Sequence, residues 1–240
     1  MKPIAILEHS AVAPAAHLAD AVALSGMRSH VVRLHADEAL PDLSEVSALV
    51  SLGGIMGAYE EDKYGFLADE KALLRDAVAR DIPVLGICLG CQLLADALGG
   101  TAYAAASGIE AEFAPLELSP EGADDPIIGT LSEPVLSLHG DTWDPPPGAA
   151  VLAKSGRLPH AFRSGSAVAI QSHPEVSAAI VTEWIDGFGR DRFAAAGVDP
   201  DALLGQIEAA DEQNRDRAAR LFGAWLAEVA ATLPTESDRA

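Results

Sequence analysis

The sequence is poor in cysteine, in basic residues and in long apolar runs, and each shortage excludes a class of protein. Its 240 residues include two cysteines, too few for a disulfide framework. Sixteen Lys and Arg stand against 36 Asp and Glu, and the net charge of −20 disfavours nucleic acid and anionic membranes as partners. No run approaches the roughly 18 apolar residues that span a bilayer, and MKPIAILEHS lacks the pattern of a secretory signal. We therefore expect a cytoplasmic protein that keeps its thiols reduced.

What the sequence does have is a 49% hydrophobic content and an alternation of short apolar runs with helical patterns. Such alternation is typical of an α/β fold in which helices flank a doubly wound, mostly parallel sheet. The expected parallel strands are Pro3–Leu7, His30–Leu34, Ala48–Leu52 and Pro83–Ile87, with helices at Ala15–Ser25 and Ala68–Arg80.

The second half of the chain indicates shorter strands, some of them antiparallel, followed by helices. The expected strands are Thr101–Ala105, Glu110–Leu118, Val135–Leu138, Ala150–Lys154, His160–Arg163 and Ala167–Gln171, and a helix is expected over Pro174–Phe188. Asp199-Pro200 is a strong helix start, and the polar stretch Asp211–Arg220 suggests that two helices follow it. We expect a catalytic domain over 1–190, a helical extension over 191–240 packed on it, and a frayed tail from about Thr232.

The segment VLGICLGCQLLADALGG, residues 84–100, places Cys88 where an apolar strand runs directly into a helix. Glycines at 86 and 90 allow a tight turn there and leave room for a substrate. The positive end of the helix dipole would stabilise a thiolate, the reactive form of cysteine. The pattern predicts that Cys88 is a nucleophile.

A cysteine nucleophile needs a base and a group that orients the base. His173 directly follows the apolar strand that ends at Gln171, so we expect it at the same edge of the sheet as Cys88. Pro174 is expected to start a helix, which would place Glu175 in the first helical turn. Its carboxylate could then reach one imidazole nitrogen and leave the other facing the thiol.

Donors for an oxyanion are expected at Gly53-Gly54, which follows the strand that precedes the cysteine strand in sequence. Gly54 is the expected backbone donor, together with the N–H of Leu89, the residue after the nucleophile.

These residues resemble the class I glutamine amidotransferase family, whose triad is Cys-His-Glu. The likeness rests on Val84–Gly99, Gly53-Gly54, Gln171–Glu175 and the segment Ser137–Asp141, and it covers about residues 1–188. The last of these motifs is similar to the branch that includes the glutaminase half of GMP synthetase. The resemblance implies a flavodoxin-like fold.

The resemblance also implies a reaction, in which Cys88 attacks the side-chain amide of glutamine and forms a γ-glutamyl thioester. It implies that Gly53 and Gln92 contact the substrate, and that backbone at Ser137, Leu138 and His139 holds its α-amino and carboxylate ends. It implies no metal and no organic cofactor. Ammonia from such domains is usually passed to a synthetase, so the resemblance implies a partner in the form of a separate synthetase subunit.

Two other functions remain open at this point. A stand-alone γ-glutamyl hydrolase acting on γ-glutamyl conjugates would use the same triad, because the acyl half of its substrate is identical. A DJ-1-like redox or chaperone protein would share the cysteine elbow but not the His173–Glu175 pair. Cys91, which completes a C-x-x-C spacing, is either a packing residue or a thiol that could form a disulfide with Cys88. The oligomeric state is not indicated.

Overall fold

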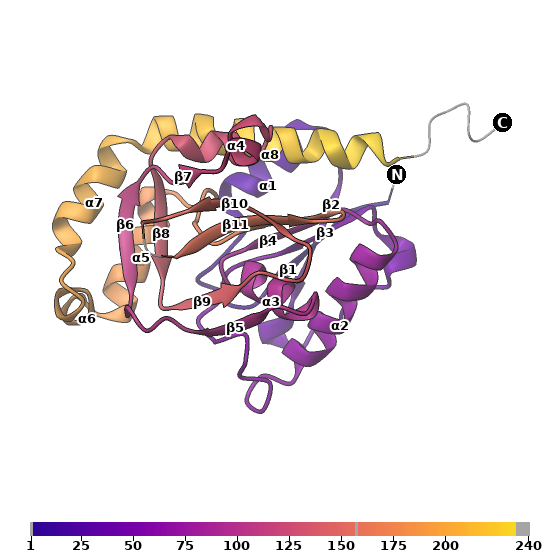
Figure 1. Ribbon diagram of the computed structural model, residues 1–240, viewed down its shortest axis with the longest axis horizontal. Coiled ribbons are helices and arrows are strands. Elements are labelled where there is room, and N and C mark those ends of the chain that lie inside the picture. Colours follow the sequence, from indigo (N-terminus) through magenta and orange to yellow (C-terminus); the bar gives the residue numbers. More distant parts are fainter. Residues whose placement is uncertain (1, 157, 234–240) are drawn as a thin grey trace.

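The computed structural model describes residues 2–156 and 158–233, which form a central sheet flanked by helices, as expected (Figure 1). Its eight strands follow the order β2-β1-β3-β4-β12-β11-β10-β7. The five strands from β2 to β12 are parallel, and the remaining three are antiparallel to their neighbours. These strands are β1 (Ile4–Glu8), β2 (Ser29–Arg33), β3 (Ala48–Ser51), β4 (Val84–Ile87), β7 (Glu117–Leu118), β10 (Ala150–Lys154), β11 (Pro159–Ser164) and β12 (Ala167–Ile170).

Two small antiparallel ribbons lie beside this sheet. One pairs β5 (Thr101–Ala104) with β9 (Asp141–Asp144), and the other pairs β6 (Glu110–Ala114) with β8 (Val135–His139). The second ribbon matters for function, because β8 carries the expected substrate-binding backbone.

Helices cover both faces of the sheet. They are α1 (Ala16–Leu24), α2 (Phe66–Ala79), α3 (Leu89–Ala97), α4 (Pro120–Asp124), α5 (Ala178–Phe188), α6 (Arg190–Ala195), α7 (Pro200–Ala209) and α8 (Asp211–Ala231), with 3-10 turns η1 (Leu34–Ala36), η2 (Leu43–Glu45) and η3 (Ile128–Ser132). Every helix within residues 2–156 and 158–233 is too short or too polar to cross a lipid bilayer.

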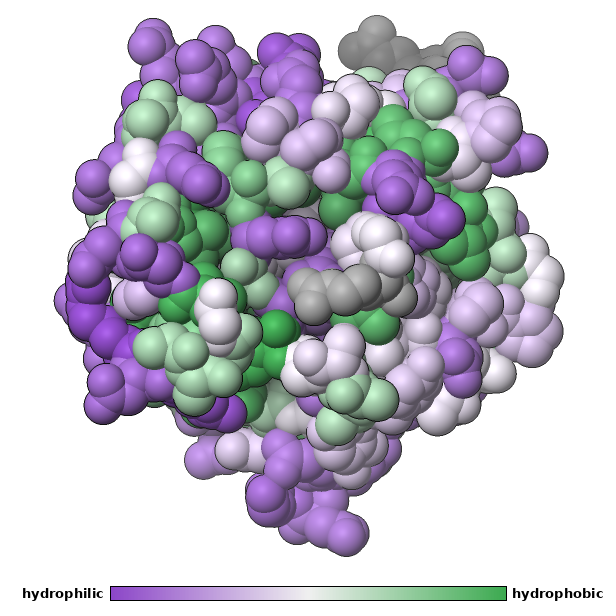
Figure 2. Space-filling view, turned by 60° about the vertical axis from the view of Figure 1, so that its left-hand side comes forward, coloured by the Kyte–Doolittle hydropathy of each residue, from purple (hydrophilic) through white to green (hydrophobic). Residues whose placement is uncertain are grey.

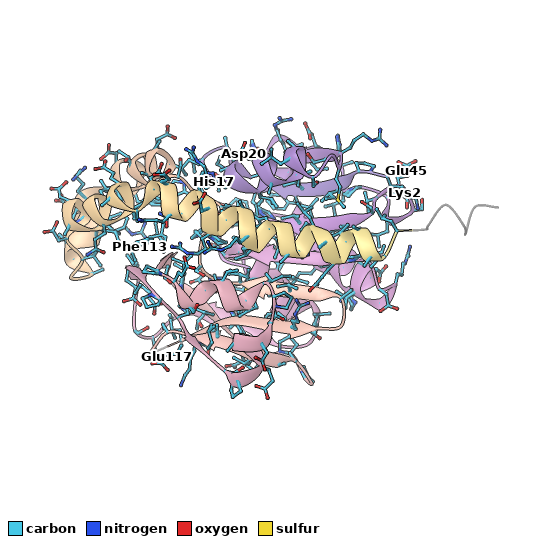
Figure 3. The ribbon with its side chains drawn as sticks, turned by 90° about the horizontal axis from the view of Figure 1, so that it is seen from above. Lys2, His17, Asp20, Glu45, Phe113 and Glu117 are labelled. Atoms are coloured by element: carbon cyan, nitrogen blue, oxygen red, sulfur yellow. The ribbon has the colours of Figure 1, made fainter. Side chains whose placement is uncertain are left out.

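The alternation of side chains along β1 builds two separate cores. Ile4 and Ile6 face the layer formed by α1 and α8, whereas Ala5 faces the layer formed by α2 and α3. Figure 1 shows these helices above and below the sheet, and Figure 3 shows α8 running across the molecule with His17 of α1 beside it. Trp225 of α8 is completely buried in the first core.

A third cluster joins α5, α6 and α7 to the β6–β8 ribbon, through residues such as Ile185, Phe193 and Leu203 packed near Leu136. Figure 2 turns this end of the molecule forward and shows hydrophobic patches among hydrophilic residues. The C-terminal helices are thus packed on the rest of the fold at two places, although the domain boundary at 190 stays a prediction.

The expected strands and helices agree with the structure, apart from end shifts, except in two segments. Glu110–Leu118, expected as one strand, is two strands that pair with different partners. Pro115 lies between them and has no N–H with which to continue a ladder. The helix expected from Pro174 begins only at Ala178, so Glu175 lies in a turn and not in a first helical turn.

Other elements of the second half were not expected from the sequence, notably β9, α4 and α6. The helix start at Asp199 is confirmed, since its side chain accepts hydrogen bonds from the N–H groups of Asp201 and Ala202. The polar stretch lies in α8, which is separate from α7, so two helices follow as expected. α8 ends at Ala231, and residues 234–240 of the expected tail lie outside the described part of the chain.

Candidate active site

Cys88 lies between the end of β4 and the start of α3, on the turn that the sequence indicated. Its φ of 52° and ψ of −106° are rare for a residue with a side chain, and they turn the thiol out of the strand. The backbone N–H of Cys88 donates to the carbonyl of Ile170 at 2.8 Å, which ties this turn to β12. Gly90 has no room for a side chain, because an added Cβ would lie 2.0 Å from the Ser51 carbonyl oxygen. Contacts with Ile170 of β12 and Ser51 of β3 therefore hold the strained turn from two sides.

His173 meets Cys88 because β4 and β12 are adjacent and parallel, so that their carboxyl ends lie side by side. The Nδ1 atom of His173 lies 2.8 Å from Glu175 Oε1, and the imidazole lies beside Cys88, which lines the same cavity and interacts with it electrostatically. The backbone N–H of His173 donates to the carbonyl of Leu136 at 2.7 Å. Trp184 of α5 packs its ring edge-on against the imidazole, with centroids 4.8 Å apart. The three residues expected to form a triad are therefore in contact.

Electrostatics at this site favour a protonated imidazole. Burial alone would lower the pKa of His173, but the charges of Cys88 and Glu175 and hydrogen bonds to both hold that pKa well above its usual value. An imidazole in this setting can take the thiol proton and keep it near neutral pH. The arrangement therefore suits nucleophilic attack by sulfur.

Gly53 and Gly54 follow β3, which neighbours β4, and Gly53 lies against Cys88 and His173. A Cβ added to Gly53 would stand 3.2 Å from His173 Cε1 and 3.7 Å from Cys88 Cβ. The N–H groups of Gly54 and Leu89 donate to no acceptor among the residues that the structure describes. Two free donors beside a nucleophile suit a developing oxyanion, which stays a prediction for these two residues.

A cavity of about 220 Å³ opens beside the thiol. Gln92, Leu138 and His139, all expected to contact substrate, line it together with Gly54 and Leu89. Gln92 also donates to Gln171 Oε1 at 3.3 Å, which sets the direction of its side chain. Ser137 is buried in β8 and, like Gly53, is absent from the described lining of the cavity.

Several lining residues were missed by sequence reasoning. Asp141 lies within the motif that carries the family resemblance, but the motif pointed only to the backbone before it. Burial raises the pKa of its carboxyl group, and the Glu60 charge adds to this, while a hydrogen bond from Tyr59 at 3.2 Å opposes it. Arg192 of α6 lines the cavity too, and no sequence signal pointed to it, because α6 itself was not expected.

A second group of ionisable side chains adjoins the cavity wall. Glu110, His139 and His160 are all buried, and one ligand-type atom of each lies within 4.8 Å of the others. His160 Nε2 lies 2.7 Å from Glu110 Oε1, and His139 Nδ1 lies 2.9 Å from the Asp141 carbonyl. Burial lowers the pKa of His160 and favours a neutral ring, despite the opposing hydrogen bond to Glu110. These residues are of types that could ligate a metal, and the expectation that no metal is used stays a prediction.

The comparison with protein families agrees with this geometry. Residues 15–184 match the family model described as "Glutamine amidotransferase class-I". Among curated proteins, GMP synthase of Thermomicrobium roseum is 36% identical over 143 residues, covering 58% of this chain and 25% of the relative. One subunit of the glutamine-hydrolysing GMP synthase of Halobacterium salinarum is 35% identical over 109 residues, covering 43% of this chain and 58% of the relative. The matched region is thus a quarter to somewhat over half of these relatives.

Solved structures are similar over nearly the whole chain. A glutamine amidotransferase from Thermotoga maritima has a TM-score of 0.83 at 30% identity, covering 94% of this chain and 98% of that one. A glutamine amidotransferase from Methylobacillus flagellatus has a TM-score of 0.84 at 26% identity, covering 95% of each chain. The likeness therefore includes the C-terminal helices as well as the region that matches the family model.

Proposed function

Because this chain belongs to the class I glutamine amidotransferase family, we propose that it hydrolyses the γ-amide of glutamine through a thioester on Cys88. The observation that carries the proposal is the contact of Cys88, His173 and Glu175 beside a cavity of suitable size. The DJ-1-like alternative would gain support if His173 and Glu175 lay remote from Cys88, but His173 lines a cavity with Cys88 and is bonded to Glu175.

In the first half of the proposed reaction, His173 takes the thiol proton and the sulfur attacks the γ-carbonyl carbon. The carbonyl oxygen becomes an oxyanion, which the N–H groups of Gly54 and Leu89 would stabilise. When the carbon–nitrogen bond breaks, His173 returns the proton to the leaving nitrogen and ammonia departs. Glu175 holds the imidazole in position throughout, through its hydrogen bond to Nδ1.

In the second half, a water molecule attacks the thioester carbonyl. His173 accepts a proton from that water, the same N–H groups stabilise the second oxyanion, and the carbon–sulfur bond breaks. Glutamate leaves and the proton returns to the sulfur, so the enzyme is restored without any external co-reactant.

A separate synthetase would consume the ammonia in this proposal. Support comes from the Halobacterium salinarum relative, which is named as one subunit of a GMP synthase. The rim of the cavity offers apolar surface to such a partner, since Ile55 is 61% and Phe188 37% exposed there.

The same rim keeps a second candidate open, a γ-glutamyl hydrolase whose leaving amine is larger than ammonia. An apolar leaving group could contact Ile55 and Phe188 while the γ-glutamyl half occupies the cavity. The triad is indifferent to this choice, because it acts on the γ-carbonyl in either case.

The deciding experiment measures ammonia or amine release from glutamine and from a panel of γ-glutamyl amides, with Cys88→Ser as control. Glutaminase activity, or activity that rises when a co-purifying synthetase is added, supports the first proposal. Strong hydrolysis of a larger γ-glutamyl amide without a partner supports the second. Activity that survives in Cys88→Ser would rule out both.

A further inference from the structure

Another buried histidine, His9, lies beside the Gly53-Gly54 turn and outside the expected triad. His9 follows β1, and its Nε2 atom lies 2.7 Å from Oε2 of Glu70 on α2. The other carboxylate oxygen of Glu70 accepts a hydrogen bond from Ser51 Oγ, also at 2.7 Å. The remaining ring nitrogen of His9, Nδ1, lies 3.3 Å from the Gly53 carbonyl oxygen. All three side chains are buried, so the cluster is isolated from solvent.

The partners of His9 define its protonation state. A backbone carbonyl can only accept a hydrogen bond, so Nδ1 of His9 must carry a proton, and Nε2 carries one as well when its partner Glu70 is ionised. A neutral imidazole has one N–H, whereas an imidazolium has two. Burial lowers the pKa of His9, but the charge of Glu70 and the hydrogen bonds to Glu70 and Gly53 outweigh burial, so the pKa of His9 is raised and the imidazolium is favoured.

The hydrogen bond to Gly53 has a geometric consequence one residue further on. The Gly53 carbonyl and the Gly54 N–H belong to the same peptide unit, which is planar and trans. In a trans unit the two groups point in opposite directions. Holding the carbonyl toward His9 therefore turns the Gly54 N–H away from His9.

We infer that His9 is a positioning residue for the reaction, which aims the Gly54 N–H at the oxyanion by fixing the Gly53 carbonyl. Glu70 and Ser51 hold His9 in turn, so a chain of three buried side chains connects α2 to the oxyanion donor. This inference rests on the proposed function, because it assigns a role within that reaction.

Two substitutions at His9 separate positioning from stability. In His9→Asn the side-chain amide lies near the place of Nδ1 and can still donate to the Gly53 carbonyl. In His9→Gln the amide reaches the place of Nε2, so it can bond Glu70 but leaves the Gly53 carbonyl without its donor. Both variants replace the imidazole with a neutral amide, which makes them matched controls for each other in stability.

The experiment measures kcat and KM for glutamine, or for the γ-glutamyl amide that wild type hydrolyses best. We expect kcat of His9→Gln to lie about 10- to 100-fold below that of His9→Asn, because a misplaced donor loses much of its effect. KM should stay similar in both, and so should the rate at which iodoacetamide alkylates Cys88. Equal kcat values in the two variants would overturn the inference.

Two additions make the test decisive. If the unpaired Glu70 charge prevents folding, the same two substitutions are compared in a Glu70→Gln background, which removes that charge. Inactivity of wild type on glutamine and on every γ-glutamyl amide counts against the proposed function instead. Crystal structures then test the inference without turnover: a Gly53–Gly54 peptide that keeps its orientation in His9→Gln contradicts it, and a rotated one supports it.

Discussion

Two buried histidine–carboxylate pairs flank the Gly53-Gly54 turn, and they differ in what the second ring nitrogen faces. His173 and Glu175 lie 2.8 Å apart, and His9 and Glu70 lie 2.7 Å apart. In both pairs the pKa of the histidine is raised by its anionic neighbours in spite of burial. The second nitrogen of His173 is left for a thiol, whereas that of His9 faces a backbone carbonyl.

This difference separates a pair that can move a proton from one that cannot. A thiol can give its proton to an imidazole and take it back, so the His173 pair can cycle through two charge states. A peptide carbonyl has no proton to exchange, so the Nδ1 proton of His9 stays in place and holds one geometry while the His173 pair cycles. We therefore propose that the same two residue types form an acid–base group in one place and a fixed support in the other.

Among the substitutions that test this difference between the two pairs, replacing His173 should have the largest effect on kcat. We expect His173→Gln to lower kcat by roughly 10³-fold or more, since losing the general base leaves only binding and the oxyanion donors. Hydrolysis of glutamine is the measurement, with circular dichroism to confirm folding. A loss of less than about 10-fold would show that another group takes the thiol proton.

Removing the orienting carboxylate should have a smaller effect. Glu175→Gln is expected to lower kcat by about 10²-fold, because the imidazole loses its charged partner. The pKa of His173 should fall as well, so that alkylation of Cys88 by iodoacetamide at neutral pH slows down. Glu70→Gln is the matched control and should leave the alkylation rate unchanged, and an equal slowing in both variants would contradict the distinction between the pairs.

The pH dependence of stability follows from the sign of the two shifts. An unfolded histidine has a pKa of about 6.5. A histidine whose pKa is higher than this in the folded state contributes its full stabilisation at pH values below about 6.5. The contribution is lost as the pH rises through the folded value. We therefore expect the free energy of unfolding to decrease from about pH 6.5 upward, as measured by urea denaturation. In Glu70→Gln the free energy of unfolding should decrease less steeply with pH. An unchanged pH dependence would mean that His9 does not contribute to it.

The smallest effect is expected at Cys91. It is completely buried in the core beside α2 and α3, and burial raises the pKa of its thiol, which disfavours a role as a thiolate. Cys91→Ala should cost about 1–2 kcal/mol of stability and change kcat by less than about threefold. Mass spectrometry after mild peroxide should find no link between Cys88 and Cys91, and such a link would instead make Cys91 a redox partner of the nucleophile.

The approach of His173 to Cys88 could be predicted from the sequence because each of these two residues has a strong local signal. Cys88 lies between two glycines at a strand–helix junction, and His173 directly follows an apolar strand. Parallel strands bring their carboxyl ends to one edge, so two local signals were enough to place the thiol and the base together. The support at His9 had no such signal, because Glu70 is 61 positions away and on a helix.

The misplaced helix start at residue 174 has a similar cause. Pro174 favours a first helical residue at that position, yet residues 174–177 form a turn that lets Glu175 fold back on His173. The N–H of Ala178, where α5 begins, is instead bound by Asp211 Oδ1 of α8 at 3.2 Å. A cap that comes from 33 residues away cannot be read from the local pattern.

The packing of α8 on α1 shows that the residues needed to fold this protein extend beyond those that match the family model. The family match ends at residue 184, yet Leu221, Phe222 and Trp225 of α8 complete the core over β1. A chain cut at the end of the match would keep Cys88, His173 and Glu175 and expose that apolar face of the sheet to water. The segment that matches the family model is therefore shorter than the segment that we expect to fold with its core covered, and expression trials should keep residues up to at least Ala231.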